Sequence, residues 1–214
     1  IESAQEAYKS VLSDVGANLP LSDDTDRRII KETLERSYTY VGSKSGIRGE
    51  IDNEKDAGGY ELYPEEMRPA DFDTDLDGLP DWWEEINGSN VNSAAGDYSD
   101  SHADNNNDGF STLEDYLAFM ASPNKILKPG EVTDIDLKAM FAGYTQSPMY
   151  TVDDPQSISH ISGSKLTIAA PSQIGIYPIT LTVTDGDGAS YTRLLNIAVT
   201  QKEILNIEQT VINE

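Results

Sequence analysis

The chain has 214 residues, with 38 Asp and Glu against 15 Lys and Arg, and its formal net charge is −23. A surface this acidic repels nucleic acid and anionic membranes, so we expect neither as a partner. The chain contains no cysteine, which excludes disulfides, thiolate metal sites and a cysteine nucleophile.

Targeting signals are equally sparse. No stretch approaches the roughly 20 apolar residues that span a membrane. No signal peptide is visible, but the sequence begins with Ile rather than Met. We therefore interpret the chain as a processed product or a fragment, in which a lost export signal would leave no trace.

Residues 1–70 are predicted to form helices followed by a wrapping loop. One helix is expected in AQEAYKSVLSDV, and a second in LSDDTDRRIIKETLERSYTYV with Ser22 as its N-cap. Between residues 42 and 69, Gly and Pro are frequent and periodicity is weak, which indicates a long loop. Because such a segment makes a poor core alone, we expect it to pack on another part of the protein.

Residues 71–115 concentrate the negative charge, with 13 acidic residues and no Lys or Arg. This segment opens with DTDLDGLPDWWEE, which follows the calcium-loop pattern D-x-D-x-D-G-x5-E. Calcium takes six to eight oxygen ligands, a tight loop can turn alternate carboxylates inward, and Gly78 permits the sharp turn. The alternative is a solvated acidic turn. The predicted ligands are Asp73, Asp75, Asp77, Leu79 through its backbone carbonyl, Asp81 and Glu84.

A second loop of the same length follows, with fewer charges and a shorter closing Asp. Its predicted ligands are Asp104, Asn106, Asp108, Phe110 through its carbonyl, Thr112 and Asp115. An Asn-rich turn is the alternative. Two Ca²⁺ sites are therefore expected, the first stronger than the second. Asp97 and Asp100, between the loops, are interpreted as solvated charges, with extra ligands as the alternative.

Neither loop fits an ordinary EF-hand. Pro64 and Pro69 disfavour an entering helix before the first loop, whereas helices are predicted after both loops, in WWEEI and TLEDYLAFMA. This loop–helix format is similar to that of dockerins. Trp82 and Trp83 point about 100° apart on a helix and cannot form one flat sugar platform, so at least one is expected in the core.

The last 90 residues change to β-type alternation. KLTIAA, YPITLTVTD and TRLLNIAVT alternate apolar and polar residues, and VTDIDLKAMF and PMYTV add further strands. DGDGAS is a predicted hairpin turn, in which Asp185 and Asp187 are interpreted as solvated, with calcium binding as the alternative. The strands are sufficient for a β-sandwich.

The predicted fold class is α+β and multidomain. Residues 1–70 form a helical and wrapping-loop segment, 71–123 an EF-hand-like or dockerin-like calcium-binding module, and 124–200 an all-β sandwich. Residues 201–214 are interpreted as a tail or linker.

Four stretches, in order, resemble the end of secreted bacterial pectate lyases of the parallel β-helix type. They are SAQEAYKSVLSDVGA, DDTDRRIIKETLE, DAGGYELYPEEMRPADFDTDLDGLPDWWEE and NNDGFSTLEDYL, and they lie within residues 1–120. The first three make the match specific. The chain departs from that family at Tyr60, which has no adjacent Pro where the family usually has a Trp-Pro pair. Residues 125–200 resemble cadherin-like or immunoglobulin-like modules of secreted bacterial proteins.

The resemblance implies an extracellular or cell-surface location, an upstream β-helix catalytic domain as partner, and a plant-type polysaccharide as substrate of the whole protein. The family's catalytic residues have no counterpart here, so the chain itself is expected to be non-catalytic. His102, beside the second loop, is interpreted as a surface residue and His160 as part of a strand. Two other functions remain open: a surface adhesion or glycan-binding module, and a dockerin-type assembly module.

Overall fold

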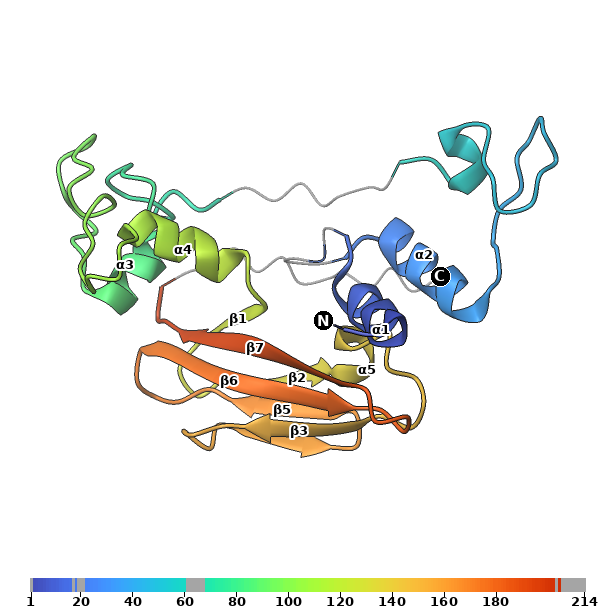
Figure 1. Ribbon diagram of the computed structural model, residues 1–214. Coiled ribbons are helices and arrows are strands. Elements are labelled where there is room, and N and C mark those ends of the chain that lie inside the picture. The colour runs from blue at the N-terminus through green and yellow to red at the C-terminus, as the bar shows by residue number, and fades with distance from the viewer. Residues whose placement is uncertain (1, 17, 19–21, 61–67, 203, 205–214) are drawn as a thin grey trace.

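The computed structural model describes residues 2–16, 18, 22–60, 68–202 and 204. Helices and two β-sheets are both present, so the chain belongs to the α+β class (Figure 1). Across these residues, no helix has the length and apolar character needed to cross a membrane. Pro64, and the predicted tail beyond residue 204, lie outside the described residues.

Seven strands within residues 124–199 form the two sheets. One sheet has the order β1-β7-β6-β3 and the other has the order β2-β5-β4. β1 pairs with β7 in parallel, and the other pairings are antiparallel. The strands are β1 (Asn124–Leu127), β2 (Val132–Asp136), β3 (Met149–Asp153), β4 (Ser159–Ser162), β5 (Lys165–Ala169), β6 (Gly175–Thr184) and β7 (Ser190–Val199).

The alternating residues of the strands meet in one core between the sheets. Ile179, Leu181 and Val183 of β6 are buried together with Leu166 and Ile168 of β5 in the opposite sheet. The polar residues between them remain partly exposed, as the period-2 pattern requires. The predicted hairpin at DGDGAS is confirmed, because β6 and β7 pair from Thr184 and Ser190 outward.

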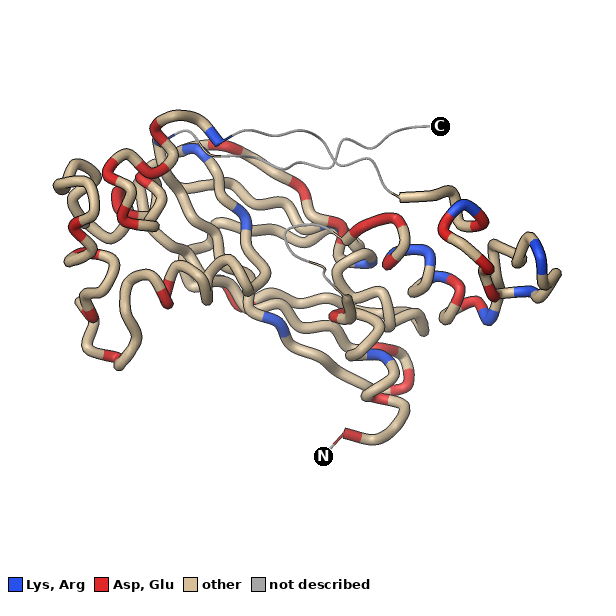
Figure 2. The backbone as a smooth tube through the Cα atoms, turned by 90° about the horizontal axis from the view of Figure 1, so that it is seen from above, with Lys and Arg blue, Asp and Glu red and all other residues tan. Residues whose placement is uncertain are grey.

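The helices lie at opposite ends of the sheets (Figures 1 and 2). At one end are α1 (Ala4–Asp14), α2 (Asp24–Glu35) and the short α5 (Leu137–Met140); at the other are α3 (Asp81–Asn87) and α4 (Thr112–Met120). A 3₁₀ turn, η1 (Glu54–Ala57), interrupts the loop that follows α2. All four predicted helices are therefore confirmed.

Three details differ from the sequence predictions. The first is VTDIDLKAMF, which is predicted as strand but forms the strand β2 only as far as Asp136; there the Asp136 side chain accepts the Lys138 N–H and caps the helix α5. The second is the cap of α2. The N-cap of α2 is Asp23, whose side chain accepts a hydrogen bond from the Asp26 N–H, and not Ser22. The Asp carboxylate also carries a negative charge to the positive end of the helix, which favours it over the hydroxyl.

The Asp185–Asp187 turn is the third difference, since the interpretation of Asp185 as solvated is wrong. Asp185 is only 4% exposed and forms an ion pair with Lys9 of α1, as does Asp187. The docked α1 helix excludes water from this turn and supplies the positive charge itself.

Candidate metal centre

Each of the two acidic loops leads directly into a helix at its ninth position. α3 begins at Asp81 and α4 begins at Thr112. α4 has a full capping box, in which Ser111 and Glu114 exchange hydrogen bonds, whereas α3 begins after Pro80, which has no side-chain cap. In Figure 2, Asp and Glu recur along this part of the tube, and residues 71–115 contain no Lys or Arg.

The backbones of the two loops match position by position. The ninth residue donates its N–H to the carbonyl preceding the loop, Asp81 to Phe72 and Thr112 to Ala103, both at 2.8 Å. The fourth residues, Leu76 and Asn107, have φ of 61° and 59°. The two loops therefore share a left-handed residue at the same place, although one is Leu and the other Asn.

The sixth and seventh positions match as well. Gly78 and Gly109 have φ of 96° and 95°, values that disfavour any residue with a Cβ. Their N–H groups donate to the first carboxylate of each loop, Asp73 at 3.2 Å and Asp104 at 3.0 Å. Each seventh N–H donates to the fifth carboxylate, at 2.8 Å for Asp77 and 2.9 Å for Asp108. These bonds turn the carboxylates toward the interior of each loop.

In the first loop, Asp73, Asp75 and Asp77 bring carboxylate oxygens within 4.8 Å of one another, and this group could hold a metal ion. Asp75 and Asp77 are 4% and 2% exposed. One oxygen of each of the three carboxylates is buried without a hydrogen-bond partner among the described residues. Buried like charges without partners are costly, and a bound cation would offset that cost.

Glu84 lies beside this group and is fully buried, and neither of its carboxylate oxygens has a partner among the described residues. Burial and then the charges of Asp75, Asp77, Asp81 and Asp100 raise the pKa of Glu84 to about 8. Burial likewise raises the pKa of Asp77, with Asp75 and Asp73 adding to the effect against the Leu79 N–H. Both shifts arise from burial first and then from the neighbouring negative charges, which disfavour ionisation.

Asp81, also a predicted ligand, has a different set of contacts. One carboxylate oxygen accepts the Thr74 N–H at 2.8 Å, and the other accepts the Thr74 hydroxyl at 2.9 Å. The second oxygen also lies 3.3 Å from Lys202 Nζ. Asp81 therefore closes the loop onto Thr74. The sequence offered no signal for this role, because Thr74 occupies a position that the loop pattern leaves free.

The second loop brings its predicted ligands together differently. The Asn106 side-chain amide donates to Asp108 at 2.9 Å and to Asp115 at 3.5 Å, so it lies between the two carboxylates. Burial, then Asp108 and Asp104, raise the pKa of Asp115. Thr112 donates its hydroxyl to the Ala103 carbonyl, and the Phe110 side chain is exposed. Most of this loop is exposed, in contrast to the first.

Both tryptophans lie in the core beneath the loops, at 2% and 3% exposure, and cannot serve as a sugar-binding platform. Trp82 and Trp83 of α3 each contact Tyr116 and Phe119 of α4, with ring centroids 5.4 to 5.9 Å apart. The same cluster includes Ala198 of β7. The two loops thus share one aromatic core, and that core rests on the β1–β7–β6 sheet.

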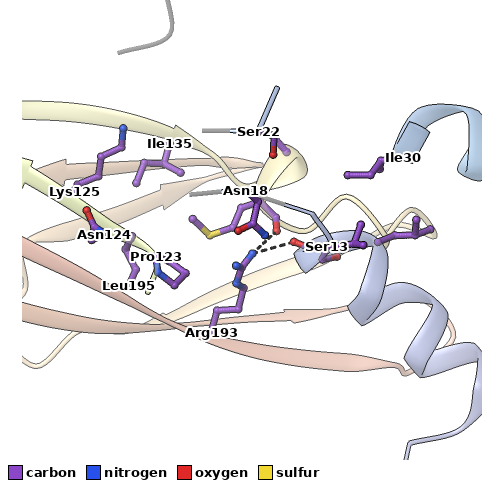
Figure 3. A pocket seen from close by; sticks show the side chains of 14 residues that line it. Ser13, Asn18, Ser22, Ile30, Pro123, Asn124, Lys125, Ile135, Arg193 and Leu195 are labelled. Atoms are coloured by element: carbon purple, nitrogen blue, oxygen red, sulfur yellow. Dashed lines mark hydrogen bonds between the residues drawn. The ribbon is translucent and has the colours of Figure 1, made fainter. Parts of the chain in front are cut away.

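A pocket of about 190 Å³ lies between α1, α5 and the start of β1 (Figure 3). Arg193 is among the residues that line it. The guanidinium already donates to the carbonyls of Ser13 and Met140, both at 3.1 Å, and to Asp14. This pocket is therefore part of the joint between α1 and the sheets.

The two histidines, His102 and His160, lie outside the first acidic loop. His102 is exposed and stacks on Tyr98, with ring centroids 5.8 Å apart. His160 is part of β4, as predicted, and pairs with Thr167 of β5. Neither has a carboxylate hydrogen bond within the described residues.

Comparisons with known proteins add little. No family model and no curated protein matches the chain. A nucleoside hydrolase-related hypothetical protein from Saccharophagus degradans aligns with 38% of this chain and 23% of its own, at 17% identity and a TM-score of 0.29. A putative alpha-galactosidase from Bacteroides fragilis covers 36% of this chain and 16% of its own, at 11% identity and a TM-score of 0.28.

A PKD domain from the KIAA 1837 protein matches 37% of this chain and 82% of its own, at 24% identity and a TM-score of 0.28. With TM-scores this low, these likenesses carry no argument about function. The function has to be inferred from the residues themselves.

Proposed function

We propose that residues 71–123 form a calcium-binding module with two EF-hand-like loops, and that the chain is the non-catalytic C-terminal region of an exported polysaccharide lyase of the pectate lyase type. In this role the module and the sandwich stabilise and space the catalytic part. The lyase assignment rests on the sequence resemblance, and the calcium assignment rests on the loops.

The observation that carries the calcium proposal is Glu84. A fully buried carboxylate with two unpartnered oxygens is rare unless a positive charge faces it. Its position at the end of the first loop is where calcium loops place a carboxylate that closes the shell with both oxygens. The neighbouring Asp73, Asp75 and Asp77 supply further hard oxygens, which suit Ca²⁺ rather than a softer metal.

The second loop is the weaker site in this proposal. Its side chains are largely exposed, and the Asn106 amide donates to Asp108 and Asp115 where a cation would otherwise bridge them. Calcium binding there requires this amide to turn its oxygen inward. The matching backbone bonds of the two loops support the assignment of both.

Calcium titration of the full chain tests the proposal. We expect two bound ions for the unaltered chain and the loss of the tighter one in Asp77→Asn. Asp71→Asn is the matched control, because Asp71 is exposed and precedes the loop. The chain should also melt at a higher temperature in calcium than in EDTA, with about 2.7 kcal/mol of added stability at 100 times the dissociation constant. Identical melting curves in calcium and EDTA would refute the metal assignment.

A further inference from the structure

The free oxygens of the first loop supply six ligands, which is the lower end of the range for calcium. Calcium takes six to eight oxygens. The unpartnered buried side-chain oxygens belong to Asp73, Asp75, Asp77 and, with two, Glu84. The Leu79 carbonyl adds one more by its position in the loop. Asp81, whose position usually contributes a ligand, has both oxygens hydrogen-bonded to Thr74. The shell therefore has room for one or two further oxygens, from water or from outside the loop.

The segment between the two loops folds back over the first loop. The Ser93 N–H donates to Asp75 Oδ2 at 3.0 Å, although the two residues are 18 positions apart. On its other side, the segment is fixed by Ser101, which is fully buried and accepts the Leu113 N–H at 3.1 Å. The segment is thereby attached to Asp75 at one end and to α4 at the other.

Asp100 is an acidic residue of this segment, half-buried and next to the buried Ser101. Its Oδ2 accepts the Asn90 N–H at 2.9 Å, which fixes the carboxylate, and its Oδ1 accepts no hydrogen bond within the described residues. Asp100 is also among the charges that raise the pKa of both Asp77 and Glu84. The segment that carries this carboxylate is the one that Ser93 attaches to Asp75, and one oxygen of Asp100 stays available.

We propose that Asp100 is a further residue of the first calcium site and takes the place that Asp81 leaves by closing the loop onto Thr74. It supplies an oxygen to the ion directly or through one bound water. This inference rests on the proposed calcium function. It makes the first site a product of two segments, the loop of residues 73–84 and the residue that precedes the buried Ser101.

The test compares Asp100→Asn with Asp97→Asn in the full chain. Both variants remove one negative charge from the same segment, but Asp97 is exposed and its Oδ1 accepts the local Ser99 N–H. The asparagine at position 100 can still accept the Asn90 N–H. Calcium binding is followed by tryptophan fluorescence, since the only two tryptophans lie on α3, at the end of the first loop.

We expect Asp100→Asn to weaken binding at the tighter site about 10-fold or more, and Asp97→Asn to change it less than about 2-fold. In EDTA, Asp100→Asn should melt at or above the temperature of the unaltered chain, because a repelling charge has been removed. Equal calcium affinities for the two variants would overturn the proposal. So would an equal loss of stability in calcium and in EDTA, which would assign Asp100 a structural role. If the unaltered chain binds no calcium, the proposed function itself fails.

Discussion

Lys9 Nζ lies 2.5 Å from Asp185 Oδ2 and 2.7 Å from Asp187 Oδ2. These contacts connect the first helix to a turn that is more than 170 positions away in the sequence: the separations are 176 and 178 positions. Lys9 is 3% exposed and Asp185 is 4% exposed. Burial alone would lower the pKa of Lys9, but hydrogen bonds to Asp185 and Asp187 outweigh it and raise that pKa. The first helix is therefore bound to the β6–β7 hairpin by a buried ion pair.

Replacing Lys9 with Met should destabilise the chain by about 3–5 kcal/mol, because it leaves Asp185 buried without a counter-charge. Urea unfolding measures the loss. The double variant Lys9→Met, Asp185→Asn should recover part of it, since the orphaned charge is removed. Lys44→Met, on an exposed loop residue, is the control and should stay within about 0.5 kcal/mol of the unaltered chain. A Lys9→Met variant as stable as the control would contradict the buried pair.

Gly143→Ala should also detach α1 from the sheets, through a steric clash rather than the loss of a charge. A Cβ at Gly143 would lie 2.0 Å from the Lys9 carbonyl oxygen, so the backbones could not keep their present contact. The Gly143 N–H also donates to the Ser13 hydroxyl at 3.1 Å. Because both variants undock α1, the costs of Gly143→Ala and Lys9→Met should not add, and the coupling in a double-mutant cycle measures this. Simple additivity would show that the two contacts are independent.

The calcium-free chain should lose stability as the pH rises. The pKa of Glu84 is about 8 in the folded state, against an ordinary value of 4.5. Between these values the folded state holds a proton that the unfolded state has released, so each pH unit lowers stability by at most about 1.4 kcal/mol. Urea midpoints in EDTA from about pH 5 to about pH 8 measure the slope. Glu84→Gln should remove this contribution, and a slope that persists in that variant would assign it to other groups.

Phe119→Ala should weaken both calcium sites as well as the fold. Phe119 packs against both tryptophans, and removing a buried Phe side chain costs about 3–5 kcal/mol. Leu117→Ala on the same helix is the control, because Leu117 is 55% exposed and should cost little. Calorimetric calcium titration of both variants tests the coupling. If Phe119→Ala left both affinities unchanged, the shared aromatic core would not link the sites.

The chain alone should release no unsaturated uronate from pectate in the presence of calcium. Its net charge of −23 repels a polyuronate, and its best-placed acids are assigned to calcium. Ultraviolet absorbance of the unsaturated product provides the assay, with a β-helix pectate lyase as the positive control. Product formation by this chain in isolation would reverse the non-catalytic proposal.

Local patterns were sufficient to predict much of this structure. The loop spacing located the first carboxylate cluster, and alternation located β5, β6 and β7, because each pattern depends on residues only a few positions apart. The four-residue strand β1 has too few residues to show a clear period. It forms because β7 offers it a partner.

Long-range contacts could not be read from the sequence in the same way. The Asp185–Asp187 turn resembles any solvated turn until Lys9 is brought to it from the start of the chain. Similarly, the sequence pattern does not distinguish Asp97 from Asp100. The difference between them depends on the bonds that Ser93 and Ser101 make to Asp75 and Leu113. Partners supplied by distant segments decide which acids are buried.

The parallel pairing of β1 with β7 has a mechanical consequence. Tension between the start of β1 and the end of β7 would slide the two strands past each other, from Asn124 opposite Asn196 to Leu127 opposite Val199. The bonds at both ends, Asn196 N–H to Pro123 and Thr200 N–H to Leu127, would be loaded together with those between them. Because the bonds must break together rather than one after another, this edge resists shear better than an antiparallel hairpin pulled open from its ends.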